Sequence, residues 1–116
     1  MEIDIPNEIR SFIDGVVDSF VMWDLLVFWS KKPEGMETPA QIAQLLGHTL
    51  EEVRKPVQKL EKIGLISAQK RLDGELACGL NPQSELFPSL QSFWSFNENQ
   101  ENRLRILSYL LQKRIR

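Results

Sequence analysis

The sequence predicts a mainly α-helical fold with one small β-hairpin and with extra helices at both ends of the chain. Three observations lead to this prediction. Between residues 39 and 63, apolar residues recur at spacings of three and four, which is typical of helices that bury one face. Capping signals at Thr38 and Thr49 divide this stretch into two helices. After Gly64 the helical spacing stops, and the pair Asp73-Gly74 separates two short runs, as in a hairpin.

Residues 1–35 are predicted to form two N-terminal helices. The first follows Pro6 and carries apolar residues at helical spacing, namely Ile9, Phe12, Ile13, Val16 and Val17. Asp18 or Ser19 can cap the second, which ends near Lys31 because Pro33 and Gly35 follow. Residues 20–29 leave that helix almost no polar face, so we expect the terminal helices or a second subunit to cover it. The run is too short for a membrane span, which needs about 20 apolar residues.

Residues 36–82 carry the clearest local signals. Thr38 suits the N-cap of the first central helix, Pro39 its first position and Gly47 its C-terminal cap. Its expected apolar stripe is Ile42, Leu45 and Leu46. Thr49 and Glu52 form a capping box for the second helix, which spans residues 50–63 and ends at Gly64. Its expected inward stripe is Val53, Val57, Leu60 and Ile63. Two short helices joined by Gly47-His48 predict a helix-turn-helix.

The hairpin and the C-terminal segment complete the predicted architecture. Leu65–Leu72 and Glu75–Leu80 are the two expected strands, and Asp73-Gly74 favours a two-residue type I′ turn. Residues 83–116 begin with an aromatic-rich segment that forms a short helix near Pro88. The last helix, over residues 99–114, is amphipathic, and we expect its inward face to be Leu104, Leu107, Leu110 and Leu111.

Composition limits the possible classes of function. A chain of 116 residues suits one domain, and we predict a single one over 1–116. The net charge is −2, and residues 36–82 hold six Lys/Arg against six Asp/Glu, so a DNA-facing positive field has to be local. The N-terminus lacks the features of a secretory signal, and one cysteine, Cys78, fits the cytoplasm. No catalytic motif or Cys/His metal cluster is present, so we expect neither an enzyme nor a cofactor.

The central stretch resembles the winged helix-turn-helix domains of the MarR and ArsR groups of bacterial transcription regulators. The resemblance covers roughly residues 23–82 and is carried by Ile42-Ala43-Gln44-Leu45-Leu46-Gly47, Leu50-Glu51-Glu52-Val53 and Leu60-Glu61-Lys62-Ile63-Gly64-Leu65-Ile66. It implies that helix 50–63 enters the DNA major groove and that the wing, residues 66–80, lies along the phosphates. It also implies a cytoplasmic homodimer held by the N- and C-terminal helices, which would read two half-sites of double-stranded DNA.

Seven polar side chains are the candidate DNA-binding residues. On the second helix, Arg54 and Lys55 can donate to guanine edges or phosphates, Gln58 can pair with adenine, and Lys59 lies further toward the C-terminal end. On the wing, Gln69, Lys70 and Arg71 can contact phosphates. The alternative is that these side chains form an ordinary solvated face.

Two features disturb the DNA-binding interpretation. Glu51 and Glu52 open the presumed recognition helix, where they suit the helix dipole but repel phosphates. Pro56 lies inside the helix, where it removes a donor and clashes with the carbonyl of Glu52, so the helix kinks there or its first turn is separate. The alternative function is therefore a winged-helix module that binds a protein and no DNA. His48, in the turn, is expected to be a capping or surface residue, and Cys78 a small packed residue.

Overall fold

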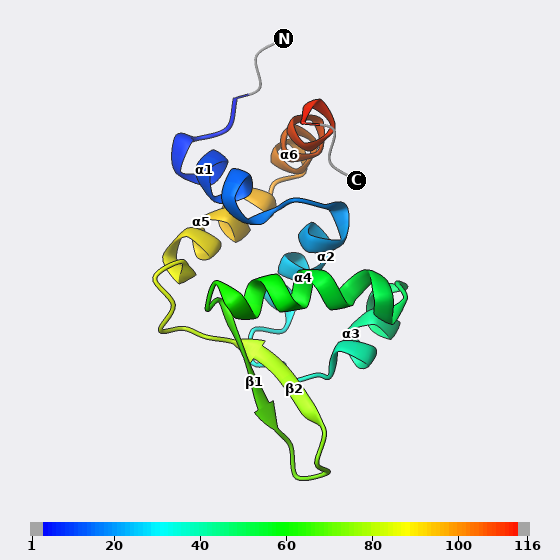
Figure 1. Cartoon of the computed structure of the whole chain (residues 1–116). Coiled ribbons are helices and arrows are strands. Elements are labelled where there is room, and N and C mark those ends of the chain that lie inside the picture. Colours follow the sequence, from blue (N-terminus) through cyan, green and yellow to red (C-terminus); the bar gives the residue numbers. More distant parts are fainter. Residues whose placement is uncertain (1–3, 114–116) are drawn as a thin grey trace. The chain divides into compact units, whose positions relative to one another are not determined.

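The computed structural model describes residues 4–113, and in this range the chain forms six helices and one two-stranded antiparallel sheet (Figure 1). The predicted fold class, mainly helical with a small hairpin, is confirmed. The chain divides into two compact units, which are described separately. We call residues 21–87 the central unit and the described parts of residues 1–20 and 88–116 the terminal unit.

The central unit contains the predicted helix-turn-helix, made by α3 (Pro39–Leu46) and α4 (Leu50–Lys62). Both helices start with a capping box: Thr38 exchanges hydrogen bonds with Gln41, and Thr49 with Glu52. The second box was predicted and is confirmed, whereas the first was not recognised. Gly47 adopts φ +74° at the end of α3, the left-handed conformation that favours glycine. In Figure 1, α3 lies beside the first turns of α4.

The hairpin follows α4 and projects from the central unit (Figure 1). Gly64, at φ +79°, ends the helical segment, and the amide of Leu65 donates to the carbonyl of Leu60. Strand β1 (Ile66–Lys70) then pairs with β2 (Leu76–Leu80) in the register Ile66–Leu80 to Lys70–Leu76. The strands are therefore shorter than the predicted runs, since Leu65 precedes the ladder and Arg71, Leu72 and Glu75 belong to the turn at its end.

The turn of the hairpin differs from the prediction. The amide of Gly74 donates to the carbonyl of Arg71, and the amide of Arg71 donates to the carbonyl of Glu75. Leu72, Asp73 and Gly74 thus form a three-residue loop, in which Gly74 adopts φ +88°. This is the geometry of a tight turn followed by a left-handed residue, and not the predicted two-residue type I′ turn. The Asp-Gly pair suits both, so the pair alone did not fix the loop length.

The core of the central unit is built from α2 (Phe20–Lys31, from Val21 on), α3, α4 and the base of the hairpin. Its buried side chains are Met22, Leu25, Leu26, Trp29, Ile42, Ala43, Val53, Val57, Leu60, Leu65, Ile66, Ala77 and Cys78. The predicted stripe of α4 is confirmed at Val53, Val57 and Leu60, and Ile63 caps the helix. The predicted stripe of α3 is wrong at Leu45, which is 62% exposed, because Ala43 beside Ile42 takes the inward position.

Pro56 lies within α4, which runs as one helix from Leu50 to Lys62. Of the two alternatives for Pro56, a kink or a separate first turn, the continuous helix excludes the separate first turn. A proline as the seventh residue of a helix leaves the carbonyl of Glu52 without its usual helical donor and costs about 3 kcal/mol relative to alanine. The capping box at Thr49 and the burial of Val53, Val57 and Leu60 on both sides of Pro56 offset this cost.

The terminal unit contains α1 (Asn7–Val16), α5 (Phe87–Asn97, from Pro88 on) and α6 (Gln100–Gln112). Its buried apolar side chains are Ile5, Ile9, Phe12, Ile13, Val16, Val17, Leu90, Phe93, Ile106 and Leu110. The rings of Phe12 and Phe93 lie with their centroids 5.6 Å apart. The hydroxyl of Tyr109 donates to Asp14 at 2.7 Å, and Lys113 also pairs with Asp14, so α6 is fixed to α1 by polar contacts as well.

The predicted inward face of α6 is wrong at two positions. Leu104 and Leu111 are 56% and 58% exposed, and Leu107 is half-buried. Ile106 and Leu110 form the buried face instead. Leucine spacing alone suggested the other face because positions 104, 107 and 111 also recur at helical intervals. None of the helices within residues 4–113 has the length and apolar character that a membrane span requires.

Candidate nucleic-acid interface and the adjoining groove

Helix α4 presents two charged edges outside its buried stripe. Arg54, Gln58 and Glu61 recur at spacings of four and three, so they lie along one edge of the helix. Lys55, Lys59 and Lys62 recur in the same way along the next edge, which points most directly away from the buried Val53, Val57 and Leu60. Of these lysines, Lys55 and Lys62 are exposed, whereas Lys59 is half-buried and has an interaction within the chain. The predicted residues of α4 are thus divided between two edges, and Lys62 extends the basic one.

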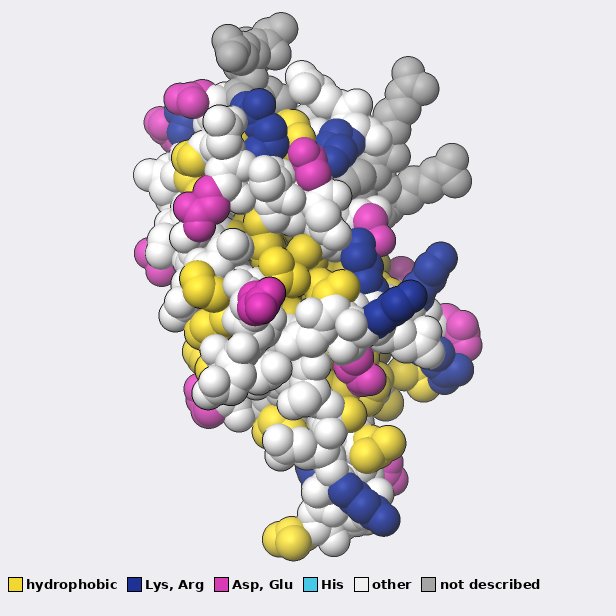
Figure 2. All heavy atoms as spheres, turned by 60° about the vertical axis from the view of Figure 1, so that its left-hand side comes forward, with side chains coloured by type: hydrophobic (Ala, Val, Ile, Leu, Met, Phe, Trp, Pro, Cys, Tyr) yellow, Lys and Arg dark blue, Asp and Glu magenta, His cyan; other side chains and the backbone are white. Residues whose placement is uncertain are grey.

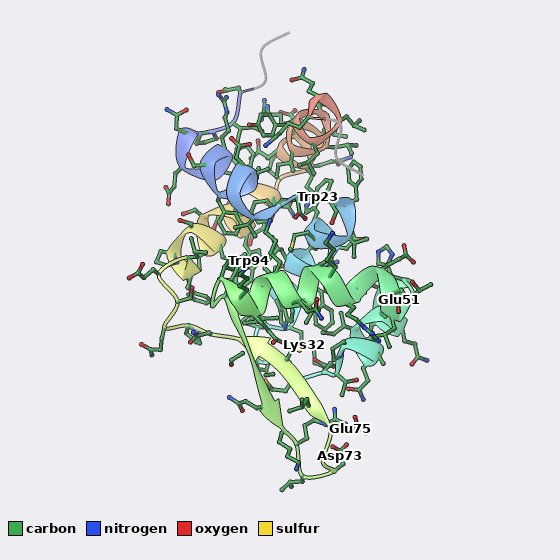
Figure 3. All side chains as sticks on the ribbon, viewed as in Figure 1. Trp23, Lys32, Glu51, Asp73, Glu75 and Trp94 are labelled. Carbon is green, nitrogen blue, oxygen red and sulfur yellow. The ribbon has the colours of Figure 1, made fainter. Side chains whose placement is uncertain are left out.

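The two glutamates at the start of α4 have different surroundings. The carboxylate of Glu52 accepts from the amide of Thr49 at 3.0 Å, and this hydrogen bond is the main reason that the pKa of Glu52 is lowered. The side chain of Glu51 is 85% exposed and lies 4.0 Å from the guanidinium of Arg54. Figure 3 shows Glu51 at the beginning of α4. The ion pair between Glu51 and Arg54 is therefore weak, and a phosphate or a base edge could displace the carboxylate of Glu51.

The wing residues are not equivalent. Gln69 and Lys70 are exposed neighbours on β1, so their side chains point to opposite faces of the hairpin. Lys70 lies opposite Leu76, on the face that also carries Cys78. Since the thiol of Cys78 contacts Glu61 of α4 at 3.7 Å, this is the face turned toward α4. Lys70 therefore lies on the same face of the hairpin as Cys78, which contacts α4, and Gln69 lies on the other face.

The side chain of Arg71 is held by hydrogen bonds within the central unit. Its guanidinium donates to Asp73 through Nη2 at 2.5 Å and through Nε at 3.3 Å, and its Nη1 donates to the side chain of Gln41 at 2.8 Å. The hydrogen bond with Asp73 raises the pKa of Arg71 and lowers that of Asp73. Gln41 belongs to the capping box of α3, so Arg71 connects the wing to the start of that helix. The contact between Arg71 and Asp73 was not predicted from the sequence, although the two residues lie only two positions apart.

A groove of about 550 Å³ lies between α4, the start of α3 and the hairpin. Its apolar lining includes Pro39, Leu50, Val57 and Leu76, and its charged lining is Arg54, Glu61 and Glu75. Figure 3 shows Glu75 on the β2 side of the hairpin. The edge of α4 that carries Arg54 and Gln58 thus faces a groove with two carboxylates, which sequence reasoning did not anticipate because the groove joins segments distant in sequence.

The central unit also carries a histidine between two carboxylates. Nε2 of His48, in the turn between α3 and α4, lies 2.8 Å from Oδ2 of Asp24 on α2, and its Nδ1 lies 3.6 Å from Glu52. The hydrogen bond with Asp24 is the largest cause of the raised pKa of His48. The expectation of a capping or surface residue left out this role, in which His48 connects α2 with the start of α4.

Cys78 is buried in β2, and burial is the first reason that the pKa of its thiol rises to about 11. The expectation of a small packed residue is consistent with this burial. In the part of the chain that the structure describes, no three His, Cys, Asp or Glu side chains are grouped so that they could hold a metal ion.

The distribution of charge on the surface is mixed. In Figure 2, Lys and Arg side chains are interspersed with acidic and uncharged ones on the visible face, and the projecting hairpin carries both basic and hydrophobic side chains. No protein-family model matches the sequence, and a search of curated proteins finds no relative.

Proposed function

We propose that the chain is a cytoplasmic bacterial transcription regulator that binds double-stranded DNA sequence-specifically. The observation that supports this proposal is the exposed outer side of α4. There Arg54, Lys55 and Gln58 project from the second helix of a helix-turn-helix, with Lys59 and Lys62 continuing the basic edge. A second helix with these side chain types suits the major groove, where Arg pairs with guanine and Gln with adenine.

The proposal gives the predicted residues different roles. Arg54 and Gln58 are the candidates for base recognition, and the lysine edge contacts phosphates. Lys70 contacts phosphates from the wing, on the face turned toward α4. Arg71 keeps the wing in place through Asp73 and Gln41 rather than contacting DNA. Gln69, on the opposite face of the hairpin, contributes little.

Fluorescence anisotropy tests this proposal. Labelled duplexes selected from a random pool are titrated with the chain at increasing salt, and the slope of log affinity against log salt counts the phosphates contacted. The double variant Lys55→Gln/Lys62→Gln should reduce the slope by about two, since each phosphate contact contributes about 0.9. Lys31→Gln removes an exposed lysine of α2 and should leave the slope almost unchanged. If no duplex binds at low salt, DNA binding is wrong.

A second candidate function is a protein-interaction module. The groove favours it, because Glu61 and Glu75 repel phosphates at the place where α4 and the hairpin face each other. Leu76, which lines the groove, is 60% exposed, and an exposed apolar side chain suits a protein partner better than a phosphate. Absence of DNA binding at low salt, together with retained folding, would favour this candidate.

We further propose a homodimer formed through the terminal helices. The exposed Leu104 and Leu111 and the half-buried Leu107 form a stripe at spacings of three and four on α6. This spacing is that of a coiled-coil seam, in which two copies of one helix bury their leucines against each other. A two-fold dimer would place two copies of α4 on two DNA half-sites.

A further inference from the structure

The outer edge of β2 is only partly used by the fold. The amide of Cys78 donates to the carbonyl of Glu37 at 2.8 Å, so the chain before α3 pairs with this edge at one position. After Glu37 the chain turns away into α3, which begins at Pro39. The alternation of the ladder places the N–H and C=O of Leu76 on the same outer edge as those of Cys78. Within residues 4–113, no hydrogen bond is made to these two groups of Leu76.

This open edge borders the groove beside α4. Leu76 lines the groove together with Pro39, Leu50 and Val57, so a segment that pairs with Leu76 would also meet an apolar surface. Leu50 and Leu76 are among the large apolar side chains that stay exposed in the central unit. A volume of about 550 Å³ is enough for one or two apolar side chains of an extended peptide. An edge strand with an adjoining apolar surface is the arrangement that proteins use for binding by strand addition.

The charges of the groove select the type of peptide. Glu61 on α4 and Glu75 beside β2 are both exposed and line the groove from its two sides. Among the described residues that line the groove, the only cation is Arg54, whose guanidinium has Glu51 as a neighbour at 4.0 Å. Lys70 lies opposite Leu76 across the hairpin but does not line the groove. The lining therefore favours basic over acidic side chains on either side of an apolar one.

We propose that this groove binds a short extended peptide segment of a partner protein, with an apolar core flanked by Lys or Arg. The backbone of the segment pairs with Leu76, its apolar side chains contact Leu50, Val57 and Leu76, and its basic side chains meet Glu61 and Glu75. The groove does not include the lysine edge of α4, but Arg54 and Gln58 line it, so a peptide bound there would cover the candidate base-recognition side chains. Peptide binding does not require the chain to bind DNA.

Titration of the folded chain with a labelled peptide tests the proposal. The probe is GSKVLRSG, and its controls are GSEVLESG, which reverses the charges, and GSKSSRSG, which removes the apolar core. We expect GSKVLRSG alone to bind saturably with a dissociation constant below about 1 mM, and to shift the amide NMR signals of Leu50, Val57 and Leu76. Methylation of the probe's central backbone amides should abolish binding, because strand addition needs these donors.

Two variants locate the site. Glu61→Gln/Glu75→Gln should weaken binding about three- to tenfold, since each exposed ion pair contributes up to about 1 kcal/mol. Glu34→Gln/Glu85→Gln changes the charge equally at exposed positions that do not line the groove, and should leave binding unchanged. Leu76→Ser, at an exposed position that does not endanger folding, should also weaken binding. Absence of saturable binding, equal binding of the acidic peptide, or equal effects of the two double variants would overturn the proposal.

Discussion

His48 joins two helices of the central unit through one imidazole. Its raised pKa means that the folded chain holds the proton more tightly than the unfolded chain does, where the pKa is about 6.5. The protonated imidazole and Asp24 therefore stabilise the fold fully below about pH 6.5, and this contribution is lost as the pH rises through the higher folded-state pKa. The sequence contains one histidine, so any imidazole contribution in this window comes from His48.

Asp24→Asn tests this assignment. The variant should be less stable than the original chain near pH 6, by less than about 1 kcal/mol, and the difference should shrink toward pH 9 because neutral imidazole has no charge for the carboxylate to attract. Urea denaturation at several pH values measures it. Glu34→Gln, in which an exposed carboxylate away from His48 is changed, should show a difference that does not vary over this range. A difference for Asp24→Asn that is equally flat would contradict the assignment.

The guanidinium of Arg71 already has a carboxylate partner within the fold, Asp73. Asp73→Asn should release the guanidinium from its two-point contact and make it available to phosphates. If the chain binds DNA as proposed, the affinity at low salt should rise and the salt slope should steepen by about 0.9, which corresponds to one more phosphate. Glu75→Gln removes the same charge from the hairpin without freeing Arg71, so it should raise affinity without steepening the slope to that extent. Equal slopes in the two variants would show that only net charge matters.

Helix α4 is continuous although its interior contains a proline, Pro56. Pro56→Ala restores the hydrogen bond to the carbonyl of Glu52, so the free energy of unfolding should increase by roughly 2–3 kcal/mol, after allowance for the greater freedom of alanine in the unfolded chain. Thermal unfolding followed by circular dichroism measures the change. Lys55→Ala, at the neighbouring exposed position, should shift the melting temperature much less.

The DNA affinity of Pro56→Ala distinguishes two roles of the proline. An unchanged affinity would mean that Pro56 is a tolerated cost in the helix. A changed affinity would mean that it orients Arg54 and Lys55, which precede it directly in the sequence. A melting temperature that falls would contradict the view that Pro56 destabilises α4.

The state of association concerns the whole molecule and depends on α6. A monomer has a mass of 13.5 kDa, and the proposed dimer twice that, so light scattering at micromolar concentration separates the two. Leu104→Lys/Leu111→Lys places charges in the proposed seam and should shift the mass to that of the monomer, while the helical circular dichroism is kept because both positions are exposed. Gln91→Lys/Ser95→Lys adds the same charge at exposed positions of α5, keeps the leucines of α6 and serves as the control. A monomeric original chain would contradict the dimer.

The positions of the helices and the hairpin were largely predictable because their signals are local. The N-caps Thr38 and Thr49 accept from free backbone amides at the start of their own helices. The helical segments end at Gly47 and Gly64, which adopt positive φ. Neither effect needs a distant residue. The spacing of Val53, Val57 and Leu60 identified the buried side of α4 for the same reason. The inward sides of α3 and α6 were not predictable with equal success, because several apolar faces were available and packing selected among them.

The candidate site was predictable only as a set of residue types. Sequence by itself determined that α4 carries Arg54, Lys55 and Gln58 away from its apolar stripe, because helical periodicity fixes the face of each residue. Only the tertiary structure decided that Arg71 is held by Asp73 and Gln41, and that Glu61 and Glu75 line one groove with Leu76. These arrangements join α3, α4 and the hairpin across gaps in the sequence. A local pattern records how one segment folds, whereas the position of a charge relative to a distant segment is determined by packing.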